Sequence, residues 1–152
     1  MNIFVRIQRL EEFQFDIVKY FTVHLEEDLS NLLVWIEEIG ENIGAKKHLF
    51  RNESITADLQ ALPPPAKQME VYEIPVENLR LYCLVLNEHI VFLFNGGIKT
   101  TNNAKDCPNV GPHIKRANQI AGKIDEQLKQ NEITWNFDHT DIKFDENLEF
   151  EL

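Results

Sequence analysis

Residues 79–100, LRLYCLVLNEHIVFLFNGGIKT, give the strongest structural signal in this chain of 152 residues. Two apolar runs, 79–86 and 90–94, are separated by a polar segment of three residues, 87–89. Such runs predict two strands that are joined by a tight turn and buried on both faces, as in the middle of a sheet. The glycine-rich segment 95–97 follows the second run and predicts the end of that strand.

On the N-terminal side, the side chains of residues 2–8 alternate in type from one residue to the next, and this alternation predicts a short strand. Residues 10–44 carry apolar side chains at helical spacing. They predict either two helices, the second capped by Asp28 or Ser30, or a single long helix.

The segments between and beyond these elements are less regular. Residues 45–67 contain three consecutive prolines at 63–65 and predict a connector, and the moderate alternation of residues 70–76 predicts a further strand. Residues 112–128 begin with a proline and place their apolar side chains on one face, which predicts the last helix. Residues 133–137 and 147–152 alternate like strands around an acidic turn.

The order of these elements predicts an α+β fold. We expect an N-terminal strand and two helices packed on a small antiparallel sheet, followed by a C-terminal helix. We expect one domain over residues 1–130 and an acidic, strand-like C-terminal extension over residues 131–152.

The charge of the chain is negative but unevenly distributed. There are 25 acidic and 15 basic residues, giving a net charge of −10, which argues against a surface that binds nucleic acid everywhere. The net charge is −8 over residues 11–41, +4 over residues 79–123 and −6 over residues 131–152. A local cationic patch is therefore expected on an acidic protein.

The sequence predicts a cytoplasmic protein with no membrane association. No apolar run is long enough to span a bilayer, and residues 1–8 do not form the basic and apolar regions of a signal peptide. The two cysteines, Cys83 and Cys107, fit reduced thiols better than a disulfide framework.

The usual motifs of catalysis and cofactor binding do not stand out. The five histidines have neither the spacing nor the cysteine partners of a metal site, and no glycine-rich phosphate-binding fingerprint occurs. Cys83 is expected in the core, and Cys107 could be an exposed thiol, although the spacing supplies no base for it. We expect no metal and no cofactor.

Residues 95–105 are the most suggestive stretch. Glycines after a buried strand permit close approach of a ligand, and the lysines, threonines and asparagines that follow are donors suited to phosphate oxygens. A plain solvated loop remains an alternative for this stretch. Arg80, between two leucines, must either face solvent or hold a buried partner, because an unpaired buried charge is costly.

The motif LRLYCL at 79–84, the tight turn, the second apolar strand, GGIKT at 96–100 and a closing helix resemble the RelE/HigB superfamily of toxin–antitoxin ribonucleases. The resemblance covers about residues 55–128, and the preceding helices follow the order of the family. Residues 35–42, WIEEIGEN, followed by Arg51, are similar to uncharacterised bacterial members of that group. The resemblance implies a RelE-like fold.

What the resemblance implies for function is an RNA endonuclease of a type II toxin–antitoxin system. Such enzymes cleave RNA through attack of a 2′-hydroxyl on the adjacent phosphate, with cationic side chains stabilising the charge at phosphorus. By this resemblance, Arg80 and Lys99 match the phosphate-binding bases, and His113 has a suitable pKa for proton transfer. The implied partners are RNA or the ribosome and an antitoxin protein of the helix-turn-helix type. The residues implied to extend the RNA path are Lys105, Lys115 and Arg116.

Three departures from the family favour a second hypothesis. Val71, Glu73 and Pro75 stand where the best-known members place lysines, the family's closing tyrosine has no clear match after Lys99, and the net charge is negative. These departures favour a non-catalytic protein-binding module on the same fold.

The acidic end of the chain has two interpretations. Its carboxylates could imitate a phosphate backbone and cover the patch around Arg80 and Lys99, or the segment could be a solubilising tail. The carboxylates in question are Asp138, Asp141, Asp145, Glu146, Glu149 and Glu151.

Overall fold

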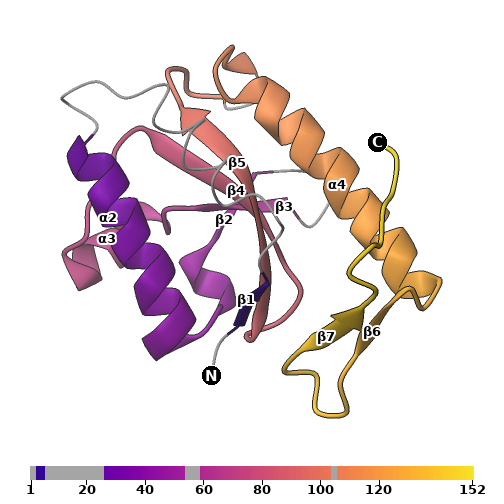
Figure 1. Ribbon diagram of the computed structural model, residues 1–152. Helices are drawn as coiled ribbons and strands as arrows, with labels where there is room; N and C mark the ends of the chain where they lie inside the picture. The colour runs from indigo at the N-terminus through magenta and orange to yellow at the C-terminus, as the bar shows by residue number, and fades with distance from the viewer. Residues whose placement is uncertain (1–2, 6–25, 54–58, 104–105) are drawn as a thin grey trace.

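The computed structural model describes residues 3–5, 26–53, 59–103 and 106–152. A five-stranded sheet lies between two helical layers, with α2 (Glu26–Glu37) and α3 (Ala66–Tyr72) on one face and α4 (Gly111–Lys129) on the other (Figure 1). The expectation of an α+β fold is confirmed. Among the described residues, no helix has both the length and the apolar character that crossing a membrane requires.

The strand order in the sheet is β1-β5-β4-β3-β2. The strands are β1 (Ile3–Val5), β2 (Arg51–Asn52), β3 (Leu59–Leu62), β4 (Leu79–Val85) and β5 (Ile90–Ile98). All neighbouring pairs are antiparallel except β1 and β5, which are parallel. The expected small antiparallel sheet is therefore present, and the N-terminal strand joins it in the parallel sense.

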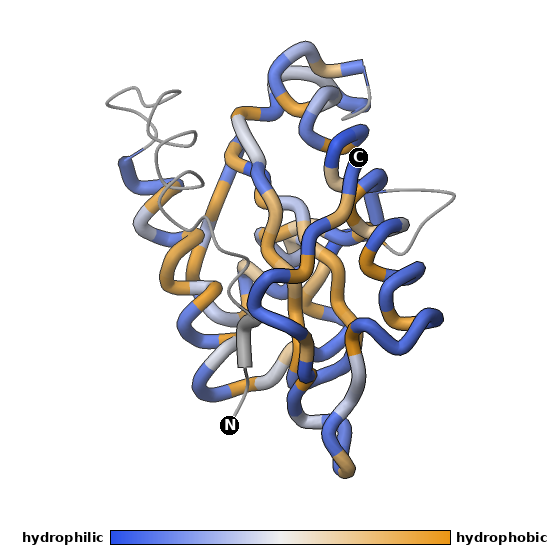
Figure 2. The backbone as a smooth tube through the Cα atoms, turned by 45° about the vertical axis from the view of Figure 1, so that its right-hand side comes forward, coloured by the Kyte–Doolittle hydropathy of each residue, from blue (hydrophilic) through white to orange (hydrophobic). Residues whose placement is uncertain are grey.

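The two central strands are apolar because both of their faces are covered. In β4, Leu79, Leu81 and Cys83 belong to the core beneath α2, whereas Tyr82 and Leu84 belong to the core beneath α4. Figure 2 shows the hydrophobic segments concentrated in these strands and the hydrophilic ones in the surrounding turns. The same alternation assigns Arg80 to the α4 face.

The glycine-rich segment does not end β5, as the sequence had indicated, because a bulge carries it into the sheet. Leu81 pairs with Gly96 and Cys83 with Leu93, so Tyr82 alone faces two residues of β5. A Cβ at Gly96 would lie 1.8 Å from the carbonyl oxygen of Arg80. Only glycine allows this strand pairing, and the strand continues to Ile98.

The helices differ from expectation at two places. Residues 70–76 do not form a strand, because Ala66–Tyr72 are mostly good helix formers that follow Pro65 and end at Glu73 in the left-handed region, with φ 57°. The helix predicted upstream of residue 26 lies outside the described residues, as does most of the strand predicted over residues 2–8. The C-terminal part of the 10–44 prediction is confirmed as α2, which continues as a π-helical segment, η2 (Glu38–Ile43).

Asp28 does not cap α2, since Glu26 and Glu27 before it are already helical. Its buried carboxylate instead accepts the backbone N–H groups of Glu77 at 2.9 Å, Asn78 at 2.9 Å and Leu79 at 3.3 Å. This contact ties α2 to the start of β4.

The acidic end of the chain packs on the α4 core through its apolar side chains. A two-stranded hairpin, β6 (Ile133–Trp135) and β7 (Ile142–Phe144), buries Ile133 and Ile142. Residues 147–152 do not form the predicted strand; they run back along α4 (Figure 1), with Leu148 and Phe150 against the core. A second strand is formed instead by residues 142–144, which a hydrogen-bonded turn folds back onto β6.

The predicted cover over Arg80 and Lys99 is not formed by the hairpin. The Asn87 side chain donates a hydrogen bond of 2.8 Å to the carbonyl oxygen of His139 in the hairpin turn. Asn87 lies in the β4–β5 turn, and Arg80 lies seven residues earlier at the other end of β4. Across the described residues, no carboxylate of 131–152 pairs with Arg80 or Lys99.

Replacing Gly96 by alanine tests the bulge. We expect Gly96→Ala to lower the free energy of unfolding by at least about 3 kcal/mol, because the new methyl group overlaps the Arg80 carbonyl. Gly122→Ala in α4 is the control, since nothing lies within 4 Å of its Cβ position and alanine favours the helix by about 0.5–1 kcal/mol. Urea unfolding of both variants gives the comparison; equal effects would contradict the overlap.

Removing the Asp28 carboxylate tests the link between α2 and β4. We expect Asp28→Ala to cost about 3 kcal/mol, because three backbone donors lose a charged acceptor. Asp28→Asn keeps one acceptor oxygen and should cost less. Glu27→Ala, an exposed change in the same turn of the helix, should stay within about 0.5 kcal/mol in the same unfolding assay.

Candidate functional site

Arg80 is a buried arginine that lies near the start of β4, where the sheet meets the N-terminal end of α4. Its side chain is 6% exposed. Its Nη1 donates to the backbone carbonyls of Glu77 at 3.1 Å and Leu79 at 2.9 Å. Its Nε has no hydrogen-bond partner within the described part of the chain.

The surroundings of Arg80 leave its charge without a close partner. Within the described residues, ion pairs form along α4, between Lys123 and Glu126 and between Lys129 and Asp125, and none involves Arg80. Burial lowers the pKa of Arg80, and the nearby guanidinium of Arg51 lowers it further. A buried cation of this kind is costly unless an anion is supplied.

Arg51, Glu53 and Tyr82 form a cluster with Arg80, and none of these three residues was among the predicted site residues. The strand register places Arg51 opposite Ala61 and Ala61 opposite Tyr82. The side chains of Arg51, Ala61 and Tyr82 therefore form a row on the α4 face. Arg51 donates from Nε to the carbonyl of Pro63 at 2.8 Å and from Nη2 to that of Pro64 at 3.0 Å.

Tyr82 is fully buried, and its hydroxyl has no hydrogen-bond partner among the described residues. Burial raises the pKa of Tyr82, and the charge of Glu53 acts in the same direction. Glu53 is the carboxylate that opposes the charge of both arginines, since it raises their pKa values. Asp28 also raises the pKa of Arg80, so the two guanidinium groups face two carboxylates, neither of which forms an ion pair with Arg80 among the described residues.

The signals for these missed residues were present in the sequence but weak. Arg51 follows the apolar pair Leu49 and Phe50, which are both buried, just as Arg80 sits between two leucines. Tyr82 looked like a core residue of a strand, which it also is. Only the register of the paired strands places Arg51 and Tyr82 on one face of the sheet.

Lys99 and His113, both predicted site residues, lie at the same end of the sheet. Lys99 comes two residues after Gly97, the strand partner of Arg80, and its backbone N–H donates to the carbonyl of Asn78 at 2.7 Å. His113 lies in the first turn of α4, with its Cδ2 3.7 Å from the Cβ position of Gly97. The absence of a side chain at Gly97 therefore lets the helix approach the strand beside Arg80.

The remaining predicted RNA contacts are less concentrated. Lys115 and Arg116 are exposed on α4, one turn after its start, and Lys105 lies outside the described residues. The structure thus brings Arg80, Lys99 and His113 to one end of the sheet and sets Lys115 and Arg116 on the adjoining helix surface.

Cys107 is buried and is not an exposed thiol, because it anchors the loop between β5 and α4. Its Sγ lies 3.3 Å from the backbone nitrogen of Thr100 and 3.4 Å from the Thr100 hydroxyl. Burial acts to raise the pKa of Cys107, but hydrogen bonds from Thr100 and from the backbone of Asn109 and Val110 outweigh it and lower the pKa to about 6. Cys83 is buried in the core as expected, and burial raises its pKa.

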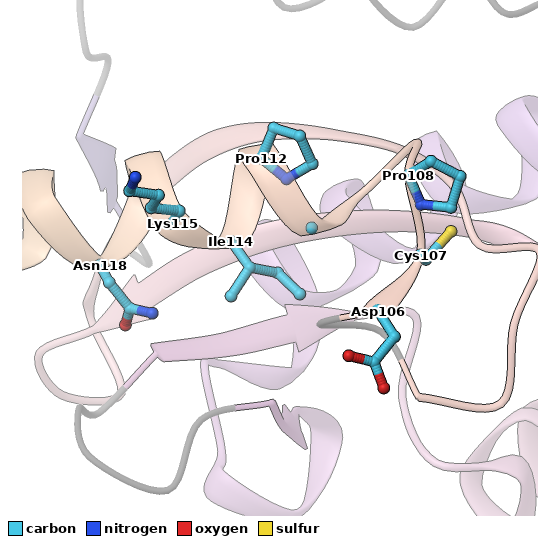
Figure 3. A pocket seen from close by; sticks show the side chains of 8 residues that line it. Asp106, Cys107, Pro108, Pro112, Ile114, Lys115 and Asn118 are labelled. Carbon is cyan, nitrogen blue, oxygen red and sulfur yellow. The ribbon is translucent and has the colours of Figure 1, made fainter.

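An open pocket of about 690 Å³ adjoins this loop (Figure 3). It is lined by Asp106, Cys107, Pro108, Gly111, Pro112, Ile114, Lys115 and Asn118. Figure 3 shows Asn118 and Lys115 toward one end of this row, and Cys107 and Pro108, with Asp106 next to them, toward the other. Within the described ranges, no three His, Cys, Asp or Glu side chains gather as a metal site would require.

The low pKa of Cys107 can be measured through thiolate absorbance at 240 nm. We expect an absorbance step near pH 6 in the native protein and in Cys83→Ser, and no such step in Cys107→Ser. Thr100→Val removes the hydroxyl donor and should move the midpoint upward, toward the ordinary value of 9.0. A midpoint near 9 in the native protein would contradict the hydrogen-bonded thiolate.

The same group links stability to pH. Because the folded pKa lies below the ordinary value of 9.0, the thiolate contribution is fully present above pH 9 and is lost as the pH falls through about 6. The difference in stability between the native protein and Cys107→Ser should shrink over that range.

The chemistry of the cluster has to be inferred from its own residues. No family model, no curated protein and no solved structure matches this chain. The charges, burial and hydrogen bonding around Arg80 are the observations that bear on its role.

Proposed function

We propose that this chain is a metal-independent endoribonuclease of the RelE/HigB type. The single observation that carries the proposal is Arg80, a buried arginine with an unpaired Nε and no carboxylate partner among the described residues. A phosphate anion supplies the charge that this environment lacks. The proposed antitoxin is a separate protein, since the hairpin at the acidic end does not reach this site.

The arrangement around Arg80 supports cleavage by 2′-hydroxyl attack. Arg80 lies in β4 and Lys99 directly follows β5 at the same end of the sheet, and both would stabilise the charge that develops at phosphorus. His113 lies over Gly97 and is the imidazole proposed to transfer a proton. Lys115 and Arg116 would hold the adjoining phosphates of the RNA.

The element order also supports the proposal. A strand and a helical segment precede a set of antiparallel strands and a closing helix, which is the order that the resemblance implies. The parallel pairing of β1 with β5 brings the start of the chain beside the strand that carries Gly96 and Gly97.

The distribution of charge makes RNA binding compatible with a net charge of −10. The acidic hairpin turn contacts the β4–β5 turn, whereas Lys99, Lys115 and Arg116 lie toward the opposite end of the molecule. Screening over about 10 Å at moderate ionic strength separates these regions. We therefore propose that RNA approaches the end of the sheet at Arg80.

A second function, protein binding without catalysis, is favoured by a different observation. Both arginines donate hydrogen bonds to backbone carbonyls. Arg80 donates to Glu77 and Leu79, and Arg51 donates to the proline pair before α3. In addition, Val71 is 67% exposed and Tyr72 is 39% exposed at the end of α3. An exposed apolar surface, together with arginines engaged in structural hydrogen bonds, is what a binding module would present.

Growth arrest and RNA cleavage test the proposal. Induced native protein should arrest growth and cleave messenger RNA on purified ribosomes. Lys99→Ala and His113→Ala should each reduce cleavage by about 10²-fold or more, as removal of charge stabilisation or proton transfer does. Arg80→Ala should abolish cleavage, provided that circular dichroism shows it folded.

Lys143→Ala is the matched control, because it removes one exposed lysine from β7 in the acidic hairpin. It should leave cleavage unchanged. Soluble native protein that neither arrests growth nor cleaves RNA would reject the endoribonuclease and favour the binding module.

A further inference from the structure

Phe137 is the most exposed large hydrophobic residue in the described part of the chain. Its side chain is 96% exposed, and it lies in the turn between β6 and β7. An aromatic side chain in this state gains free energy from any partner that removes it from water.

The turn that presents Phe137 is held by its own hydrogen bonds. The side-chain oxygen of Asn136 accepts the backbone N–H groups of Thr140 at 2.9 Å and Asp141 at 3.1 Å. The Thr140 hydroxyl donates to Asp138 at 2.6 Å. Phe137 is therefore displayed on an ordered turn, and little entropy is lost when it docks.

The surroundings of Phe137 define the charge of its partner. The hairpin and tail carry a net charge of −6 over residues 131–152, and Asp138 directly follows Phe137. A partner surface should offer an apolar recess next to positive charge.

The pocket at the start of α4 has this chemistry. Cys107, Pro108, Pro112 and Ile114 line it with apolar atoms, and Lys115 stands at one end (Figure 3). The first backbone N–H groups of α4 add the positive end of a 19-residue helix. Asp106, which lies next to Cys107 in the lining, receives a hydrogen bond of 2.9 Å from the Asn103 side chain.

The two features cannot meet within one molecule. The pocket lies at the N-terminal end of α4 and the hairpin at its C-terminal end (Figure 1). The pocket lining reaches Asn118, and the rise of α4 from there to its end at Lys129 is about 16 Å. Each molecule therefore presents an exposed aromatic side chain at one end and an open pocket with an exposed lysine at the other.

We propose that this chain associates head to tail with a second copy of itself. Phe137 of one copy enters the pocket of the next, and Asp138 faces Lys115 there. Such a contact is heterologous, so repetition produces rings or open chains rather than a closed two-fold dimer. The inference does not depend on RNA cleavage.

The mass of the native protein as a function of concentration and salt tests the contact. Light scattering after size exclusion should show species larger than 17.8 kDa at high concentration, and they should dissociate as salt increases. Phe137→Ala should weaken association at least about tenfold, as loss of a central aromatic residue does. Leu33→Ala, at another exposed apolar position outside the contact, should not weaken it.

A mixing experiment distinguishes head-to-tail contact from every other arrangement. Phe137→Ala keeps the pocket but lacks the aromatic side chain. The double variant Pro108→Glu and Lys115→Glu changes two exposed pocket residues and keeps Phe137. Each variant alone should be monomeric, and an equal mixture should form one-to-one dimers that do not grow.

Three results would overturn the proposal. The native protein could remain monomeric at all concentrations, Phe137→Ala could associate as the native protein does, or the mixture could remain monomeric. If association depended on Phe137 only after a different purified protein was added, Phe137 would be assigned to the contact with that protein instead.

Discussion

The contact between the backbone of Gly96 and the carbonyl of Arg80 is the constraint on which the rest of the structure depends. The bulge opposite Tyr82 shifts the register of β5 by one residue, and the missing Cβ lets the shifted strand remain paired with β4. With the pairing preserved, β5 extends to Ile98 and delivers Gly97 and Lys99 to the start of β4. The loop and helix that follow then pack over Gly97, which brings His113 beside Arg80.

The described region contains two buried charged side chains, and they differ in how far their charge is compensated. Asp28 accepts three backbone N–H groups, so its burial is compensated and it acts as a joint between α2 and β4. Arg80 is equally buried, but its Nε is unpaired and it forms no ion pair in the described region, where Glu53 and Asp28 act on it only through their charge. A buried cation that lacks hydrogen-bond and charge partners lowers the stability of the protein, and a ligand that supplies these partners restores it. This asymmetry makes Arg80, rather than Asp28, the residue around which a binding site is proposed.

The charge of the molecule is organised along α4. Its N-terminal end carries exposed Lys115 and Arg116 beside Lys99, and its C-terminal end leads into an acidic hairpin that packs through Ile133 and Ile142. The acidic segment is thus joined to the same core as the cationic end, and the rigid helix keeps the two apart. This separation underlies both proposals, because it leaves a cationic end open to RNA and gives each molecule two ends of opposite charge.

Periodicity in the sequence was enough to predict the elements whose signal is local. The two central strands over 79–86 and 90–94, the last helix and the α+β class follow from the spacing of apolar residues, and Arg80 stood out as a charge within an apolar strand. Spacing could not reveal the bulge that keeps residues 95–97 in the sheet, the row formed by Arg51 and Tyr82, or the packing of the acidic hairpin. Residues 70–76 were mistaken for a strand because a short, mostly exposed helix such as α3 has no buried stripe. Side-chain periodicity is a property of neighbouring residues, whereas register, close backbone approach and the meeting of distant side chains depend on contacts that exist only after the chain has folded.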